Sequence, residues 1–207
     1  MVILMKLHFN KQSINKQKKI YLIFISIITI SIILGFLFYF IISDGNKELV
    51  ITTQKSFFNN ISSNNIKYLN SFINSILSNF MYISLIFILG LSIIGFIFII
   101  GIVIFKSFIL GFSISSIIGT FGIKGVVLSL LYIFPHQILF LILLLLMCFY
   151  SCSFCYKLFK HLFLRSIINF RKLKDKYLKI YVICLIGSLI CSTYEVFIIP
   201  WLIDIFI

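Results

Sequence analysis

The segment KSFILGFSISSIIGTFGIKGVVLSLLYIFPH, residues 106–136, decides how this chain threads a membrane. It begins with an apolar run of 17 residues, Ser107 to Ile123, flanked by single lysines, and it ends in a Pro-His pair. This length lies at the short end of the roughly 17 to 25 residues that cross a bilayer. Whether the run crosses or forms a re-entrant hairpin determines the side on which the rest of the chain lies.

The composition is that of a polytopic membrane protein. Hydrophobic residues make up 61% of the chain, charged residues make up 11%, and the mean hydropathy is +1.18, whereas soluble domains are about 45 to 50% apolar. The net charge of +13 reflects basic residues that cluster, with five before Ile20 and eight between Lys157 and Lys179. This clustering indicates membrane topology and contact with anionic lipid at a basic loop, and it argues against nucleic-acid binding.

Five transmembrane helices are predicted within a single membrane domain, residues 1–207, so the fold class is an all-α polytopic membrane protein. The spans cover about residues 20–43, 80–105, 107–123, 135–156 and 180–203. Pro135 fits the first turn of the fourth helix, which leaves residues 125–134 as an outer-surface or partly re-entrant connection. The first apolar run is too long for a secretory signal, and no cleavage site follows it.

Two connecting segments are predicted to form amphipathic interfacial helices. The outer loop, residues 44–79, has apolar residues at helical spacing in its later half, which runs into the second span. The basic cytoplasmic loop, residues 157–179, has the same spacing and is typical of a helix on anionic lipid. This loop lies in the cytoplasm only if residues 107–123 cross the membrane, so the positive-inside rule favours five spans, with the amino end inside and the carboxyl end outside.

Small residues recur at every fourth position of the decisive segment. A helix would align them on one face, where another backbone can approach closely. Glycines in the predicted second span, Gly90, Gly95 and Gly101, are candidates to accept that face, within the chain or between subunits. The candidate helix-packing residues are Ser107, Gly111, Ser115, Gly119, Gly122 and Gly125.

Glu195 is the one carboxylate inside an apolar run, and such a residue should face protein or water and have a partner. Counting about 1.5 Å per residue places it in the outer half of the bilayer. His136 begins the fourth span on the same side and is the expected partner. The candidates for a partner-binding or structural polar role are His136, Glu195, Pro135 and Pro200, with transport as a less favoured role for the first two.

The sequence offers no catalytic, cofactor or metal motif that would indicate an enzyme. Cys152 and Cys155 form a CxxC pair, but no second pair accompanies them, and a zinc site needs about four ligands. Motifs for zinc proteases, serine hydrolases and nucleotide binding are missing from the sequence. We therefore expect a non-enzymatic protein without a cofactor.

Taken together, the motifs resemble stage II sporulation protein M of endospore-forming Firmicutes. The resemblance rests on a helix rich in small residues, an FG-x-K-G turn, Phe-Pro-His before a long span, and Glu-Val-Phe-Ile-Ile-Pro in the last span, and it covers roughly residues 80–203. The residues that carry it are Gly111, Gly119, Phe121, Gly122, Gly125, Pro135, His136, Glu195 and Pro200. Broader relatives often have a glycine and a glutamate where this chain has Gln137 and Phe140.

The resemblance implies a scaffold that acts when the mother cell engulfs the forespore. Such a protein recruits two peptidoglycan-degrading partners, stage II sporulation proteins P and D, and holds them at the septum in the mother-cell plasma membrane. The alternative is a small transporter or channel subunit in which Glu195, His136, Lys106 and Lys124 line a pathway.

Overall fold

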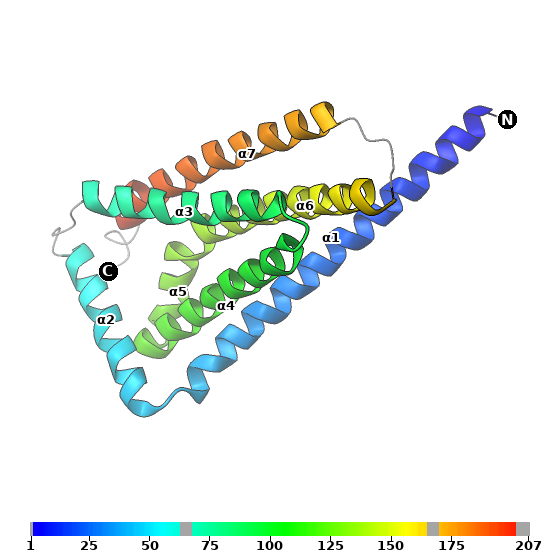
Figure 1. Ribbon diagram of the computed structural model, residues 1–207. Helices are drawn as coiled ribbons and strands as arrows, with labels where there is room; N and C mark the ends of the chain where they lie inside the picture. The colour runs from blue at the N-terminus through cyan, green and yellow to red at the C-terminus, as the bar shows by residue number, and fades with distance from the viewer. Residues whose placement is uncertain (1, 63–67, 165–169, 202–207) are drawn as a thin grey trace.

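The computed structural model describes the backbone of residues 2–62, 68–164 and 170–201, and this part of the chain is helical apart from short turns. Side chains are described for residues 21–60, 68–163 and 171–201. The helices are α1 (Val2–Ile41), α2 (Asp44–Ser62), α3 (Tyr68–Gly90), α4 (Gly95–Phe121), α5 (Ile123–Tyr132), α6 (Phe134–Leu164), α7 (Phe170–Thr193) and the π-helix η1 (Tyr194–Ile198). Figure 1 shows the long helices side by side, with α2 across one end.

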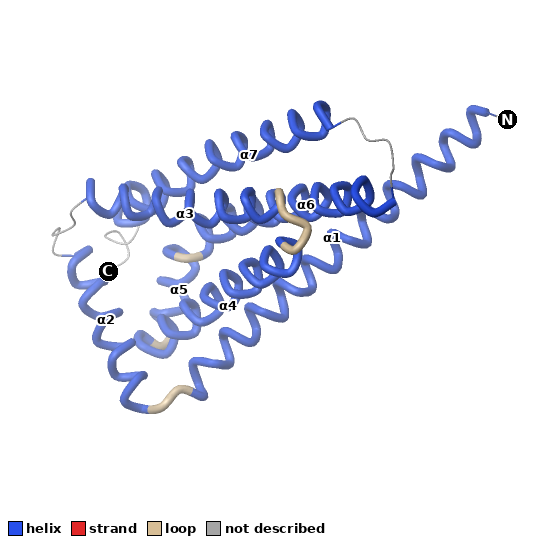
Figure 2. Tube along the Cα trace, viewed as in Figure 1, coloured by secondary structure: helices blue, strands red, loops and turns tan. Residues whose placement is uncertain are grey.

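Among the described residues, five helices are long and apolar enough to cross a membrane, which agrees with the predicted number of spans. They are Tyr21–Ile41, Tyr68–Gly90, Gly95–Phe121, Phe134–Phe163 and Arg171–Trp201. The span in α6 is the most buried of the five, and it carries the large core residues Phe140, Leu144 and Met147. Figure 2 shows the short loops, drawn in tan, that lie between described helices.

The second and third spans differ from the prediction, which placed them at residues 80–105 and 107–123 with a break at Lys106. The structure instead places the turn at residues 91–94, between α3 and α4. Lys106 therefore lies inside α4, about 16 Å from the start of the helix at ~1.5 Å per residue. In a hydrocarbon core about 30 Å thick, that position is near the middle.

A lysine can occupy this position because aromatic rings cover its ammonium group. The Nζ atom of Lys106 lies 4.6 Å from the ring centroid of Tyr82 and 5.3 Å from that of Phe140. Such cation–π contacts contribute roughly 0.5 to 2 kcal/mol each.

The turn between α3 and α4 is tight, because a Cβ atom on Gly95 would meet the carbonyl group of Leu89, and one on Gly90 would meet the hydroxyl of Tyr177.

The segment predicted as an outer loop, residues 44–79, is divided between two helices. α2 occupies residues 44–62, and α3 already begins at Tyr68. Two polar residues of α3, Ser75 and Asn79, face the bundle, where they have side-chain partners on η1 and α7. Because these polar groups are paired inside the protein, the helix can carry them within its apolar span.

Residues 125–134, predicted as an outer or re-entrant connection, belong mostly to the short helix α5. The chain reverses at Gly122, whose φ of 61° lies in the left-handed region that glycine adopts readily. α5 then packs back on the end of α4, where a Cβ atom on Gly125 would meet the carbonyl oxygen of Ile117. This reversal places Pro135 in the first turn of α6.

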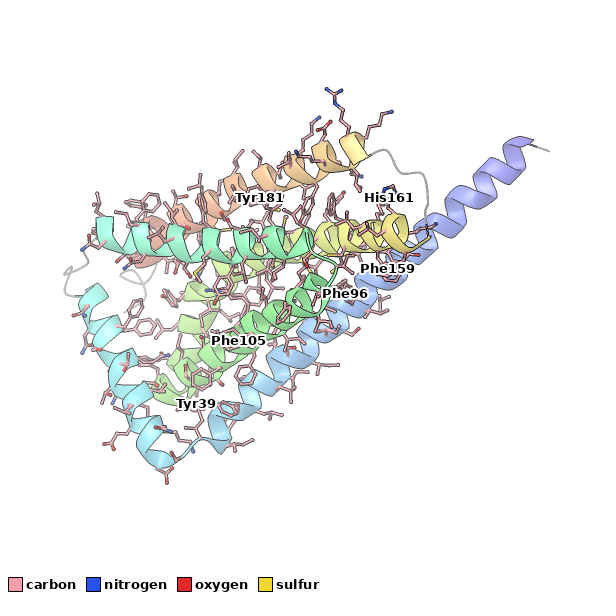
Figure 3. The ribbon with its side chains drawn as sticks, in the orientation of Figure 1. Tyr39, Phe96, Phe105, Phe159, His161 and Tyr181 are labelled. Carbon is pink, nitrogen blue, oxygen red and sulfur yellow. The ribbon has the colours of Figure 1, made fainter. Side chains whose placement is uncertain are left out.

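The small-residue face of α4 packs on α1. A Cβ atom on Gly111 would meet the carbonyl group of Ile32, and one on Gly35 would meet the carbonyl group of Phe108. The other predicted packing residues on α4 are Ser107 and Ser115, which are both buried, and Gly119, which lies against the ring of Tyr39 (Figure 3). The acceptors proposed from sequence are wrong, because Gly95 and Gly101 lie on α4 itself and Gly90 packs against Tyr177 and Ser151.

The basic segment predicted as a loop, residues 157–179, extends two of the spanning helices. α6 continues to Leu164 and α7 begins at Phe170, and the predicted positions 165–169 lie outside the described residues. The lysines at these helix ends are exposed, as Lys157, Lys160, Lys174 and Lys176 illustrate. One end of the bundle is therefore strongly basic.

Candidate functional site

Glu195 lies in a widened turn of the last helix. The regular α-helix α7 changes at Tyr194 to the π-helix η1, in which the backbone N–H of Ile199 donates to the carbonyl of Tyr194. Pro200 follows immediately, and a proline has no N–H to donate and crowds the preceding turn. Single π-turns of this kind are frequent at functional sites.

Two side chains from other helices contact the Glu195 carboxylate. The hydroxyl of Ser75 on α3 donates a hydrogen bond of 2.5 Å to Oε2, and Nε2 of His136 on α6 lies 3.8 Å from Oε1. The first contact is a short hydrogen bond, whereas the second has the separation of an ion pair rather than of a direct hydrogen bond. Glu195 thus joins α3, α6 and the last helix in one polar layer.

His136 is held at this layer by the start of α6. Pro135 occupies the first turn, where its missing N–H costs nothing, and the Tyr132 ring lies edge-on at 5.8 Å between centroids. The side chain of His136 is only 4% exposed. Its Nδ1 atom has no direct hydrogen bond among the described residues, but the backbone of Tyr132, one helical turn earlier, lies close enough to interact with the ring.

Lys106 is the third ionisable member of the layer, and it interacts electrostatically with both Glu195 and His136. The sequence argument named it only as a lining residue of the alternative pathway and otherwise used it as a boundary between spans. The sequence does contain a signal for this role, because Lys106 is a single lysine between two apolar runs. Such a lysine is as consistent with a buried cation as with a loop. The layer therefore combines an ammonium, an imidazole and a carboxylate.

A cavity of about 280 Å³ adjoins His136 on the side covered by α2. Gln54 of α2, Ser113 of α4 and Gln137 of α6 contribute polar groups to its walls. The side-chain amide of Gln54 donates to the hydroxyl of Ser116 at 2.8 Å, and its own Oε1 has no described partner. The cavity thus has polar groups from three helices in its walls, and Oε1 of Gln54 is unpaired among the described residues.

This arrangement is suited to holding helices together and to binding or moving a proton. Within the described residues, no group of three or more His, Cys, Asp or Glu side chains could hold a metal ion. The CxxC cysteines are buried thiols, and Cys155 makes its contacts with the backbone of the α3–α4 turn. Of the candidates from sequence, the structure brings together His136 and Glu195, with Pro135 and Pro200 adjacent in their helices.

The comparisons with known proteins match most of the chain to a family model. The family model described as stage II sporulation protein M matches residues 22–200, which is most of the chain. No curated protein and no solved structure matches significantly. The matched region includes the polar layer and all of the five spans except the terminal residues Tyr21 and Trp201.

Proposed function

The chain belongs to the stage II sporulation protein M family and is therefore a sporulation-related membrane protein, and we propose that it is a non-enzymatic scaffold of the engulfment complex. In this role it recruits peptidoglycan-degrading enzymes, stage II sporulation proteins P and D, and holds them at the septum. Its own location is then the mother-cell membrane that engulfs the forespore.

The observation that carries the proposal is the position of α2. This helix of 19 residues lies across the end of the bundle opposite the basic helix ends (Figure 1). It is anchored along one side by Phe58, which is 4% exposed, and by the Gln54–Ser116 hydrogen bond. Its other side is open, with Leu49 66% exposed, and an open apolar position beside charged residues suits a protein partner.

The orientation of the chain follows from charge. Basic residues concentrate in cytoplasmic segments next to membrane spans, so the ends of α6 and α7 belong in the cytoplasm. We propose accordingly that the amino end is inside, and that α2 and the carboxyl end lie outside, where peptidoglycan is. Partner enzymes that act on the cell wall would meet α2 on that side.

The localisation of the partners tests the scaffold role. Deletion of this chain should leave both partner enzymes expressed but dispersed around the membrane. The Leu49→Glu variant should disperse them as well, at normal membrane levels of the protein. The matched control is Ser92→Glu, an exposed position in the turn at the opposite end, which should leave septal localisation intact. Normal septal localisation of both enzymes in the deletion strain would refute the proposal.

Cysteine labelling tests the orientation. The five native cysteines are buried, so the labelling of a single added cysteine is distinguishable from that of the native thiols. An impermeant thiol reagent added from outside should label Lys124→Cys and should leave Ser92→Cys unlabelled until the membrane is opened. The opposite labelling pattern would mean that the chain has the inverse orientation and that α2 does not lie on the cell-wall side.

The polar layer favours a second candidate, a small transporter or channel subunit. Lys106, His136 and Glu195 lie inside the bilayer, where ionisable residues often mark ion or proton pathways, and a cavity adjoins them. Flux into proteoliposomes that is abolished by Glu195→Gln but kept by Glu48→Gln, on exposed α2, would support this function. Absence of flux in the unmodified protein would exclude it.

A further inference from the structure

A second and larger cavity, of about 560 Å³, lies far from the polar layer, between α1, the start of α4, α6 and α7. It is at the basic end of the bundle, where α1 continues past the other helices (Figure 1). One edge is closed by stacking of Tyr21 on Phe149, with 4.1 Å between ring centroids. Its volume lies within the range of about 300 to 1,000 Å³ that is common for ligand sites.

The walls of this cavity change in character from one end to the other. Towards the bundle centre they are hydrocarbon, from Ile27 of α1 and Ile100 of α4. Phe96, labelled in Figure 3, lies at the start of α4 and belongs to the same wall. In a membrane, an apolar gap between helices is filled by an acyl chain, because water is excluded from the hydrocarbon region.

The other end of the cavity carries positive charge. Lys157 of α6 and Lys176 of α7 line it, and the Nζ atom of Lys176 lies 5.2 Å from the centre of the Tyr150 ring. The cavity has no carboxylate among its lining residues, although Asp175 is next to Lys176 in the chain. Two cations above an apolar slot complement a phosphate joined to an acyl chain.

We propose that this cavity binds one anionic phospholipid from the leaflet on the basic side of the membrane. The phosphate lies between Lys157 and Lys176, and one acyl chain follows Ile27 and Ile100. This site differs from general attraction of lipid to basic helix ends, because it needs two particular lysines and a shaped slot. The inference is independent of the scaffold role, since it uses neither α2 nor the polar layer.

Native mass spectrometry of the full chain, released from nanodiscs of phosphatidylcholine and phosphatidylglycerol, tests the site. The unmodified protein should retain one phosphatidylglycerol in preference to phosphatidylcholine. The double variant Lys157→Gln, Lys176→Gln should lose about thirtyfold in this retention, since each lysine near a membrane surface contributes roughly fivefold. The control double variant Lys160→Gln, Lys174→Gln has the same net charge and should retain the lipid.

A second pair of variants tests the apolar slot without changing charge. Ile27→Trp fills the slot and should reduce retention, whereas Ile25→Trp, at an exposed position outside the cavity, should not. Free glycerol phosphate should not compete, because it lacks the acyl chain. Equal losses in the two lysine double variants, or equal retention of the two lipids by the unmodified protein, would overturn the proposal.

Discussion

The two main interfaces of this bundle are built in opposite ways. Between α1 and α4, Gly35 and Gly111 bring the backbones into contact, and no side-chain hydrogen bond links the two helices within the described residues. Between α3, α6 and the last helix, polar pairs cross the interface, including Ser75–Glu195 and Asn79–Ser192. In a bilayer, where lipid competes for apolar contacts, close packing and hydrogen bonding are the two available ways to associate helices.

The difference teaches which substitutions each interface tolerates. A close backbone contact has no room for an added atom. Such an interface is therefore sensitive to the size of the side chain placed there. At a polar interface, removal of one side chain leaves its partner buried without a hydrogen bond. Such an interface is therefore sensitive to the loss of a polar group. Three experiments, in order of decreasing expected effect, separate these two kinds of sensitivity.

The largest effect is expected at the α1–α4 interface. Gly111→Leu places a side chain against the carbonyl of Ile32 and should lower the free energy of unfolding by about 3 kcal/mol, as overpacking does in a close contact. Gly101→Leu on the same helix is the control, because a Cβ atom there has nothing within 4 Å. Unfolding in mixed micelles measures both, and equal stabilities would mean that the helices do not pack at Gly111.

The polar layer should show coupling between its members. Single variants Glu195→Gln and His136→Ala should each destabilise the protein, and the double variant should lose less than their sum, with a coupling free energy of about 1 kcal/mol. The same unfolding measurement on all four proteins gives this value. Strictly additive losses would show that the 3.8 Å approach of the two side chains contributes nothing to stability.

The smallest effect is expected for a single polar pair. Asn79→Ala removes the 2.9 Å hydrogen bond to Ser192 and should cost about 0.6 kcal/mol, the average for such bonds in membrane helices. Asn74→Ala, at an exposed position of α3, serves as the reference. If Asn79→Ala lowered the free energy of unfolding as much as Gly111→Leu does, the two interfaces would not differ in the way described.

The sequence predicts the two interfaces to different extents. The spacing of Gly111 and its neighbours indicates a packing face, because the distance between small residues is a local property. It does not identify the partner, since many helices offer an equally apolar surface. Glu195 and His136 are ionisable residues in apolar runs, where such residues are rare. Their positions in the same half of the membrane are therefore enough to predict that they pair.

Lys106 explains why the span boundaries could not be predicted. A charge in an apolar sequence usually ends a helix at the membrane surface, but Tyr82 and Phe140 cover this one within the bilayer. The actual turn, at residues 91–94, has no charge and no proline. Its glycines become informative only with their neighbours in space, such as Tyr177 beside Gly90.

The central position of Lys106 also has a consequence for biosynthesis. Insertion of a lysine at the middle of a helix costs about 2.5 to 3.5 kcal/mol, which the apolar remainder of α4 offsets. Tyr82 precedes Lys106 in the chain and is available when α4 enters the membrane, but Glu195 is made last. A chain that stops before its final helix would lack the carboxylate of the polar layer, and its Lys106 would be covered by the rings of Tyr82 and Phe140 alone.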